Sequence, residues 1–204
     1  ELIFHDPARL ARILTAARRP VQVVFAGKAH PADEPAKHHL QQVFRRTLDP
    51  AFGGRLAFID DYDMHVAHYL VQGCDVWLNN PRKPLEASGT SGMKIVANGG
   101  LNCSILDGWW IEGSNGSNGW DIGAPYTFDT ESAPTHESRD ADDARALLDT
   151  IENRIRPLFY DRDAHGIPRG WIARMRESIR TLAPAFSATR MVKDYARLYY
   201  PDAR

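Results

Sequence analysis

Short apolar stretches alternate with helical patterns through the first half of the chain, and this alternation constrains the fold more than any other feature. The apolar stretches lie at 21–27, 55–60, 75–80 and 100–108. Helical patterns lie between them at 30–48, at 61–73, and from Ser88 or Gly89 onward. Strands that alternate with helices are the signature of βαβ units, so the sequence predicts an α/β fold built on a parallel sheet. In such sheets, ligands bind beyond the carboxyl ends of the strands.

The two ends of the chain add helices to this core. A further helical pattern opens at Asp6-Pro7 and runs through Arg18. Residues 108–123 are rich in Gly, Asn, Ser and Trp and predict a loop, and residues 124–141 are polar and irregular. Three helical patterns follow at 142–156, 169–182 and 187–200. We therefore expect a sheet core at 1–123 and a polar loop with packed C-terminal helices at 124–204.

Composition and charge exclude several classes of protein. The formal net charge is −1, so no overall field recruits nucleic acid or an anionic membrane surface. No apolar stretch is long enough to span a bilayer, and residues 1–10 lack the pattern of a secretory signal. Cys74 and Cys103 suggest buried thiols rather than a disulfide, which favours a reducing, cytoplasmic location. The histidine pairs His38-His39 and His65/His68 have no companion residues that would complete a metal site, so we expect none.

The loop at 84–94, PLEASGTSGMK, is the strongest candidate for a binding site. It follows a predicted strand and opens a predicted helix, so its small residues leave backbone N–H groups free to cradle an anion. The order of its residues is not that of a P-loop. Lys94 lies one turn into the helix, where its amine is a phosphate partner, a nucleophile or a solvated surface group. Glu86 and the hydroxyls of Ser88, Thr90 and Ser91 converge on the same turn, which suits a ligand with both hydroxyl and phosphate groups.

These residues resemble a known family. PLEASGTSGMK, followed by Asn98-Gly99 and Leu106-Asp107-Gly108, resembles the pyridoxal-phosphate region of the glycogen and maltodextrin (α-glucan) phosphorylases. FAGKAHP at 25–31 and Asp61-Tyr62 resemble two earlier strand ends of that family. The resemblance covers essentially the whole chain. Three segments favour the bacterial branch over the animal enzymes: SGTSGMK, LDGWW and PLFYDRD at 157–163.

The resemblance implies a fold and a set of site residues. The family pairs two Rossmann-like domains around a cleft, the GT-B arrangement, and this chain resembles most of the second domain, a doubly wound parallel sheet. Lys94 matches the lysine that forms a Schiff base with pyridoxal 5′-phosphate (PLP). Thr90 and Ser91 match contacts of the cofactor phosphate, and Tyr62 matches a tyrosine packed near its ring. The segment that hydrogen-bonds the glucosyl hydroxyls is matched by Glu86, Ala87, Ser88 and Gly89.

The resemblance also implies a reaction and its partners. Inorganic phosphate would cleave the terminal bond of an α-1,4-glucan such as maltodextrin and release glucose 1-phosphate with retention. The cofactor phosphate would relay the proton, while Lys94 mainly tethers PLP. The other partner would be the N-terminal domain of the parent enzyme, and we expect the isolated piece to be inactive.

Two departures from the family pattern affect these expectations. The animal pattern has Gly-Asn where this sequence has Ser91-Gly92. In addition, an arginine and lysine cluster that binds phosphate in the family falls just upstream of Glu1, on the central first strand. We therefore expect the strands at 21–27 and 75–80 either to pair directly or to associate into homo-oligomers through their open edges.

Two other functions remain open at this stage. A GT-B glucosyltransferase that uses a nucleotide sugar also places a glutamate and glycines at such a strand end, but it has no use for a tethering lysine at Lys94. A non-catalytic module that binds glucan or a protein partner would fold and perform no chemistry. A measurement of cofactor content would distinguish the first alternative from a phosphorylase, and a measurement of turnover would distinguish the second.

Overall fold

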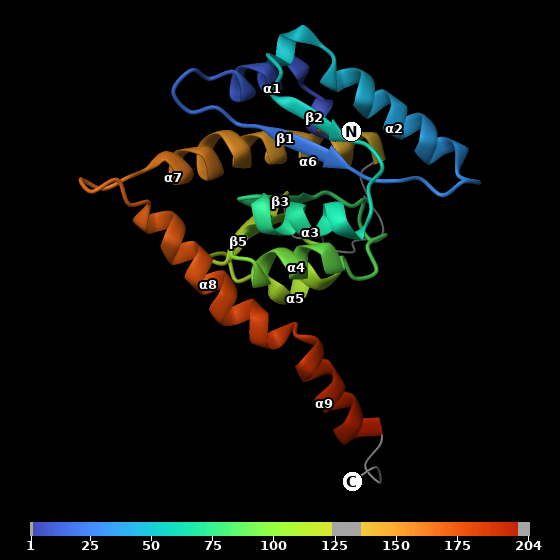
Figure 1. Ribbon diagram of the computed structural model, residues 1–204, viewed down its shortest axis with the longest axis vertical. Helices are drawn as coiled ribbons and strands as arrows, with labels where there is room; N and C mark the ends of the chain where they lie inside the picture. Colours follow the sequence, from blue (N-terminus) through green and yellow to red (C-terminus); the bar gives the residue numbers. More distant parts are fainter. Residues whose placement is uncertain (1, 124–135, 200–204) are drawn as a thin grey trace. The chain divides into compact units, whose positions relative to one another are not determined.

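The computed structural model describes residues 2–123 and 136–199 (Figure 1). Within these residues the chain forms two compact units, one made of 2–69 and 136–161 and the other of 70–123 and 162–199. Each unit contains a parallel sheet with helices around it. The predicted α/β class with a C-terminal helical region is therefore confirmed.

The first unit is built around two parallel strands. β1 (Val23–Ala26) pairs with β2 (Leu56–Ile59), with Val23 opposite Leu56 and Ala26 opposite Ile59. Between them the chain forms α2 (Glu34–Thr47) and the short helix η2 (Pro50–Phe52), and α2 packs on β2. α2 begins where it does because the Asp33 side chain accepts the Ala36 N–H at 2.9 Å and Pro35 lies in the first turn.

Helices from both ends of the described chain complete this unit. η1 (Leu2–Phe4) and α1 (Pro7–Leu14) come first, and Leu10, Ile13 and Leu14 of α1 are fully buried. α6 (His136–Thr150) contacts η1 and continues through a π-helical turn (Ile151–Ile155) into α7 (Arg156–Tyr160). The wide turn precedes Pro157, which has no N–H for a normal helical bond. Arg9 ties α1 to this segment through Asp149 and Glu152, at 2.5 and 2.7 Å.

The second unit contains three parallel strands in the order β3-β4-β5. Their bounds are β3 (Val76–Asn79), β4 (Leu101–Ile105) and β5 (Gly119–Ile122). The prediction that 108–123 is a loop was wrong, because this range contains α5 (Trp109–Gly113) and β5. The structure orders the range through its buried tryptophans: Trp110 and Trp120 are buried, and Trp110 Nε1 donates to Asp121 at 2.8 Å.

Besides α5, four helices of the described residues belong wholly or partly to this unit. They are α3 (Met64–Gly73), which spans the boundary between the units, α4 (Thr90–Ala97), α8 (Arg169–Ala185) and α9 (Ala188–Tyr199). α4 contacts β3, β4 and α8, and its Ile95 and Val96 pack with Trp109 and Leu182 in one buried cluster. Helix α9 has no buried residue and extends away from the sheet of its unit (Figure 1).

The two sheets correct one prediction about strand pairing. β1 and β3 were expected either to pair with each other or to associate through open edges. In the described residues β1 is bonded to β2 and β3 to β4, in separate sheets, so direct pairing of β1 with β3 was wrong. Association through open edges stays a prediction, as does the division into a core at 1–123 and an annex at 124–204.

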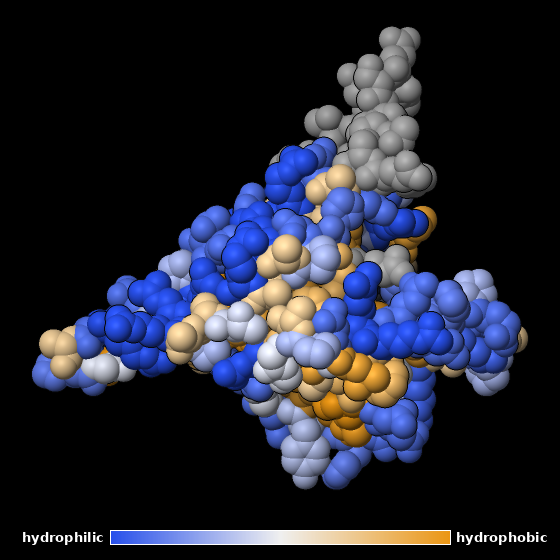
Figure 2. Space-filling view, turned by 90° about the horizontal axis from the view of Figure 1, so that it is seen from above, coloured by the Kyte–Doolittle hydropathy of each residue, from blue (hydrophilic) through white to orange (hydrophobic). Residues whose placement is uncertain are grey.

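The surface is mixed in polarity. Figure 2 shows hydrophilic side chains over most of the face that it presents, with a hydrophobic area among them. Exposed apolar residues include Met64 and Leu85. In the part of the chain that the structure describes, no helix has both the length and the apolar character needed to cross a membrane.

Candidate functional site

The loop between β3 and α4 leads into a helix whose N-terminal N–H groups have no side-chain cap. Gly89 immediately precedes Thr90, the first residue of α4, and takes a left-handed conformation with φ of 86° that favours glycine. No side chain caps this end of the helix. Because the first N–H groups of a helix lack acceptors in the helix itself, the turn at Thr90 and Ser91 presents donors and partial positive charge to an approaching anion.

Lys94 lies one turn further along the same helix, and its side chain is exposed. Its neighbours Ile95 and Val96 are buried and fix the rotation of α4 against the sheet. Among the residues that the structure describes, the Lys94 amine has no ion-pair partner. The amine is therefore free to bind or attach a ligand near the start of α4.

A glycine brings the first turn of α4 close to the sheet. A Cβ at Gly92 would lie 2.7 Å from Asn102 Oδ1 and 3.0 Å from Trp109 Nε1, so a side chain at this position would collide with both. Within the described residues, the buried Asn102 amide has no hydrogen-bond partner. On the same turn, Trp77 Nε1 donates to Ser91 Oγ at 3.2 Å, which leaves the hydroxyl proton of Ser91 available for a ligand.

The segment around Glu86 is held by the loop that follows β4. The Glu86 N–H donates to Asp107 Oδ2 at 3.0 Å, and the Trp109 N–H donates to the Ser88 carbonyl at 2.8 Å. Glu86 itself is half-buried, and its Cδ would lie 3.5 Å from a Cβ at Gly89. The structure thus brings the predicted residues Glu86, Ser88 and Gly89 together in one turn, with the exposed Ala87 between them.

Tyr62 belongs to the first unit, whereas the other predicted site residues belong to the second. It is half-buried and follows Asp61, a non-glycine residue with a positive φ of 49°. Lys28 Nζ lies 2.6 Å from Asp61 Oδ1, so the loops after β1 and β2 are joined by an ion pair. The hydrogen bond with Asp61 raises the pKa of Lys28, and the same bond lowers the pKa of Asp61.

Comparison with known proteins identifies the family of this chain. The model of the carbohydrate phosphorylase family matches residues 3–127, which is more than half of the 204 residues. The chain belongs to the carbohydrate phosphorylase family. The predicted resemblance to the phosphorylases is therefore confirmed.

Individual phosphorylases align along almost the full chain. It is 51% identical over 200 residues to a glycogen phosphorylase of Aquifex aeolicus (strain VF5), which covers 98% of this chain and 28% of that protein. It is 46% identical over 202 residues to a glycogen phosphorylase of Mycobacterium tuberculosis (strain ATCC 25618 / H37Rv). Its identity to a maltodextrin phosphorylase of Thermococcus litoralis is also 46% over 202 residues. Each of these two alignments covers 99% of this chain and 23% of the relative. The chain thus spans about a quarter of the length of these phosphorylases.

Sequence reasoning missed three groups that shape this candidate site. Asp107 was noted as part of a family segment but was given no role, although its carboxylate holds Glu86. Trp77 and Asn102, which contact or approach the first turn of α4, were assigned only to strands. The available signal was the position of Asp107 and Gly108 directly after a predicted strand, where polar residues and glycines gather at sites of parallel sheets.

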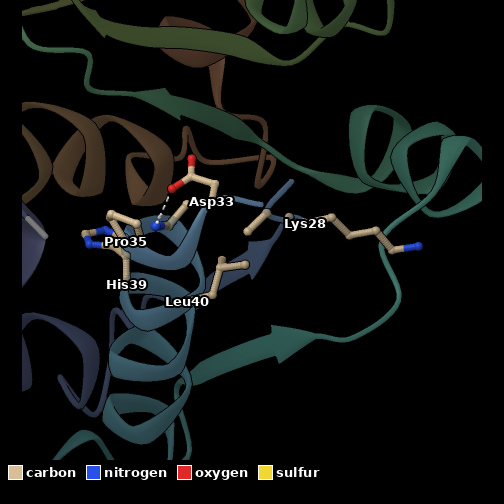
Figure 3. Close-up of a pocket in the computed structure, with 8 residues that line it drawn as sticks. Lys28, Asp33, Pro35, His39 and Leu40 are labelled. Atoms are coloured by element: carbon tan, nitrogen blue, oxygen red, sulfur yellow. Dashed lines mark hydrogen bonds between the residues drawn. The ribbon is translucent and has the colours of Figure 1, made fainter. Parts of the chain in front are cut away.

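A separate pocket of about 450 Å³ lies at the end of β1 in the first unit (Figure 3). Asp33 there is bound to the Ala36 N–H, and the Lys28 side chain extends away from His39 and Leu40. No residue of the segment 84–94 lines this pocket, so it is no part of the loop site. Among residues 2–123 and 136–199, no group of three or more His, Cys, Asp or Glu side chains gathers to hold a metal ion.

Proposed function

We propose that the chain is the C-terminal part of an α-glucan phosphorylase that uses pyridoxal 5′-phosphate. The enzyme would cleave α-1,4-glucan with inorganic phosphate and release glucose 1-phosphate with retention. The observation that carries the proposal is the exposed Lys94, one turn into a helix whose N-terminus has no side-chain cap. Membership of the phosphorylase family supports it.

The residues of the α4 turn fit this cofactor. The N–H groups at Thr90 and Ser91 suit a phosphate dianion, since a helix N-terminus favours negative charge. Lys94 would attach and orient the cofactor, while Tyr62 would pack near its ring. When bound, PLP supplies a phosphate group that donates and accepts protons near neutral pH.

The chain itself would bind and orient the sugar. We propose that the Glu86 carboxylate accepts a glucosyl hydroxyl and that the backbone of Ala87, Ser88 and Gly89 supplies further donors. Such contacts place the reacting bond in register with phosphate and reduce the entropy lost on reaching the transition state. The Ser91 hydroxyl, whose oxygen accepts from Trp77, keeps its proton for the cofactor phosphate.

A complete cleft requires more of the protein than this chain contains. The chain spans 28% and 23% of the relatives named above, and the GT-B arrangement closes the site with an N-terminal domain. We therefore propose that residues 1–204 alone have no turnover. The N-terminal domain, the glucan and inorganic phosphate are its partners in this proposal.

Turnover by the full-length protein tests the proposal. Maltodextrin and inorganic phosphate are supplied to protein stripped of PLP and to the same protein after PLP is restored. Release of glucose 1-phosphate only after PLP is restored supports the proposed function. Transfer of glucose from a nucleotide sugar without PLP would instead identify a nucleotide-sugar glucosyltransferase, and no reaction under either condition would indicate a non-catalytic module.

A further inference from the structure

We propose that Asp107 is a positioning residue that sets the conformation of the Glu86 segment and thereby the affinity of the site for sugar. The inference rests on the proposed function, because it names a residue that acts on the sugar through Glu86 and not by touching the sugar.

Two loops that follow neighbouring parallel strands are bonded to each other. Asp107 Oδ2 accepts the Glu86 N–H at 3.0 Å, and Asp107 Oδ1 accepts the N–H of Gly108 at 3.0 Å. A third bond runs in the opposite direction, from the Trp109 N–H to the Ser88 carbonyl at 2.8 Å. The Asp107 side chain thus links its own loop to residue 86, and the backbone link at Ser88 fixes the other end of the same segment.

The Glu86 side chain lies against two glycines. A Cβ at Gly108 would lie 2.8 Å from Glu86 Cγ and 2.6 Å from the Ser88 carbonyl oxygen. A Cβ at Gly89 would lie 3.5 Å from Glu86 Cδ. The absence of a side chain at Gly108 therefore leaves the space that the Glu86 side chain occupies, and Gly89 lies at ordinary contact distance from it. The direction of the Glu86 carboxylate therefore depends on how closely the two loops approach.

Asp107 is buried, and the segment that it holds is largely exposed. Asp107 is 6% exposed, whereas Leu85, next to Glu86, is 75% exposed. Few apolar contacts can hold an exposed segment, so backbone hydrogen bonds to a charged acceptor weigh more there. Such bonds are about twice as strong as neutral ones, which suits a carboxylate at this position. Removal of Asp107 should release residue 86 while leaving α4 and Lys94 in place.

The full-length protein is compared with two variants at this position. Asp107→Ala removes both acceptors, and Asp107→Asn keeps one acceptor oxygen. The matched control is Asp121→Ala, because Asp121 Oδ1 also accepts two side-chain bonds, from Trp110 at 2.8 Å and Ser114 at 2.7 Å, in the same unit. Each protein is assayed for PLP content, thermal midpoint, kcat/KM with maltodextrin and phosphate, and hydrogen exchange of peptides covering residues 84–92.

We expect Asp107→Ala to lower kcat/KM for maltodextrin by about tenfold or more, the equivalent of one lost hydrogen bond to a charged group. Exchange at residues 84–92 should accelerate, and PLP content should match that of the unchanged protein. Asp107→Asn should lose less kcat/KM than Asp107→Ala. Asp121→Ala should lower the thermal midpoint without this change in kcat/KM or in exchange.

Two results would overturn the inference. Unchanged exchange at residues 84–92 in Asp107→Ala would show that the carboxylate does not hold the segment. Equal losses of kcat/KM in Asp107→Ala and Asp121→Ala, in step with their thermal midpoints, would show a merely structural role. If the unchanged protein releases no glucose 1-phosphate, the proposed function has failed, and the role of Asp107 toward sugar fails with it. The exchange data then report separately whether Asp107 holds the loop.

Discussion

The two units hold the loops at their strand ends in different ways. In the first unit, an exposed ion pair between Lys28 and Asp61 joins the loops after β1 and β2, next to Tyr62. In the second unit, the loops after β3 and β4 are joined by the buried carboxylate of Asp107 and by a backbone hydrogen bond. Exposed ion pairs are weak and are screened by salt, whereas buried hydrogen bonds are screened much less. The second unit therefore suits exact placement of a ligand, and the first allows its loop to adjust.

The largest effect should come from Lys94, and it tests which unit carries the attachment site. Lys94→Ala in the full-length protein should abolish covalent attachment of PLP, because Lys94 is the lysine that α4 (Thr90–Ala97) carries behind its open first turn. Borohydride reduction after PLP addition, followed by peptide mapping, measures the attachment. Lys28→Ala is the control and should keep the label on Lys94. A label on Lys28 would instead place the attachment site in the first unit.

Glu86→Gln should produce the next largest effect, and it sharpens the role of the second unit. The change should weaken transition-state binding by about 1.5–3 kcal/mol, as expected when a hydrogen bond to a charged group is lost. PLP content should remain near that of the unchanged protein, since the proposed arrangement assigns Glu86 to the sugar and not to the cofactor. Turnover and cofactor absorbance are measured on the same samples. Equal losses of both would mean that Glu86 supports the fold and not the sugar.

A pair of glycine variants tests how closely the loops of the second unit approach. Gly108 and Gly116 both have positive φ, at 54° and 78°, but a Cβ at Gly116 would meet nothing within 4 Å. Gly116→Ala should cost about 1 kcal/mol from backbone strain alone. Gly108→Ala should cost about 1–3 kcal/mol more, because the new methyl group overlaps the Ser88 carbonyl. Urea denaturation compares the two variants, and equal shifts would contradict the close approach.

The smallest effect should come from Lys28→Met, which removes the ion pair of the first unit. Because that pair lowers the pKa of Asp61, its contribution to stability is present above the ordinary carboxyl pKa and is lost as the pH falls through the lowered value. The same pair raises the pKa of Lys28. Its contribution to stability is therefore fully present below the ordinary lysine pKa and is lost as the pH rises through the raised value. Thermal midpoints at neutral pH, in low and high salt, measure the effect. A loss of stability that persists in high salt would mean that this loop, too, is held by more than surface charge.

The sequence predicted the repeating elements well because their signals are local. The strands of the βαβ pattern appear within the predicted ranges, for example β1 within 21–27 and β3 within 75–80. β5 was missed because Gly119 and Asp121 lack strand propensity, and the strand forms through its pairing with β4. The separation of β1 and β3 into different sheets was missed for the same reason, since strand pairing depends on the rest of the chain.

The candidate site was only partly accessible from the sequence. Lys94, Glu86 and the small residues between them lie in one short segment, so their spacing and the family resemblance were enough to single them out. Asp107 and Asn102 lie on or after β4 and approach the segment that follows β3. Asp107 is 21 residues from Glu86 in the sequence. Which buried side chain meets which loop follows from packing, and no local pattern records that contact.

The close fit of Gly92 against Asn102 limits the order in which this sequence can change. A larger residue at position 92 collides with Asn102 Oδ1 and with the Trp109 ring unless both side chains have already moved or become smaller. The reverse order is open, because a smaller residue at 102 can be accepted while Gly92 is still present. The asparagine that the animal pattern carries at the position of Gly92 therefore requires earlier changes around both Asn102 and Trp109. In mutational terms, a substitution at position 92 has to follow the changes around it.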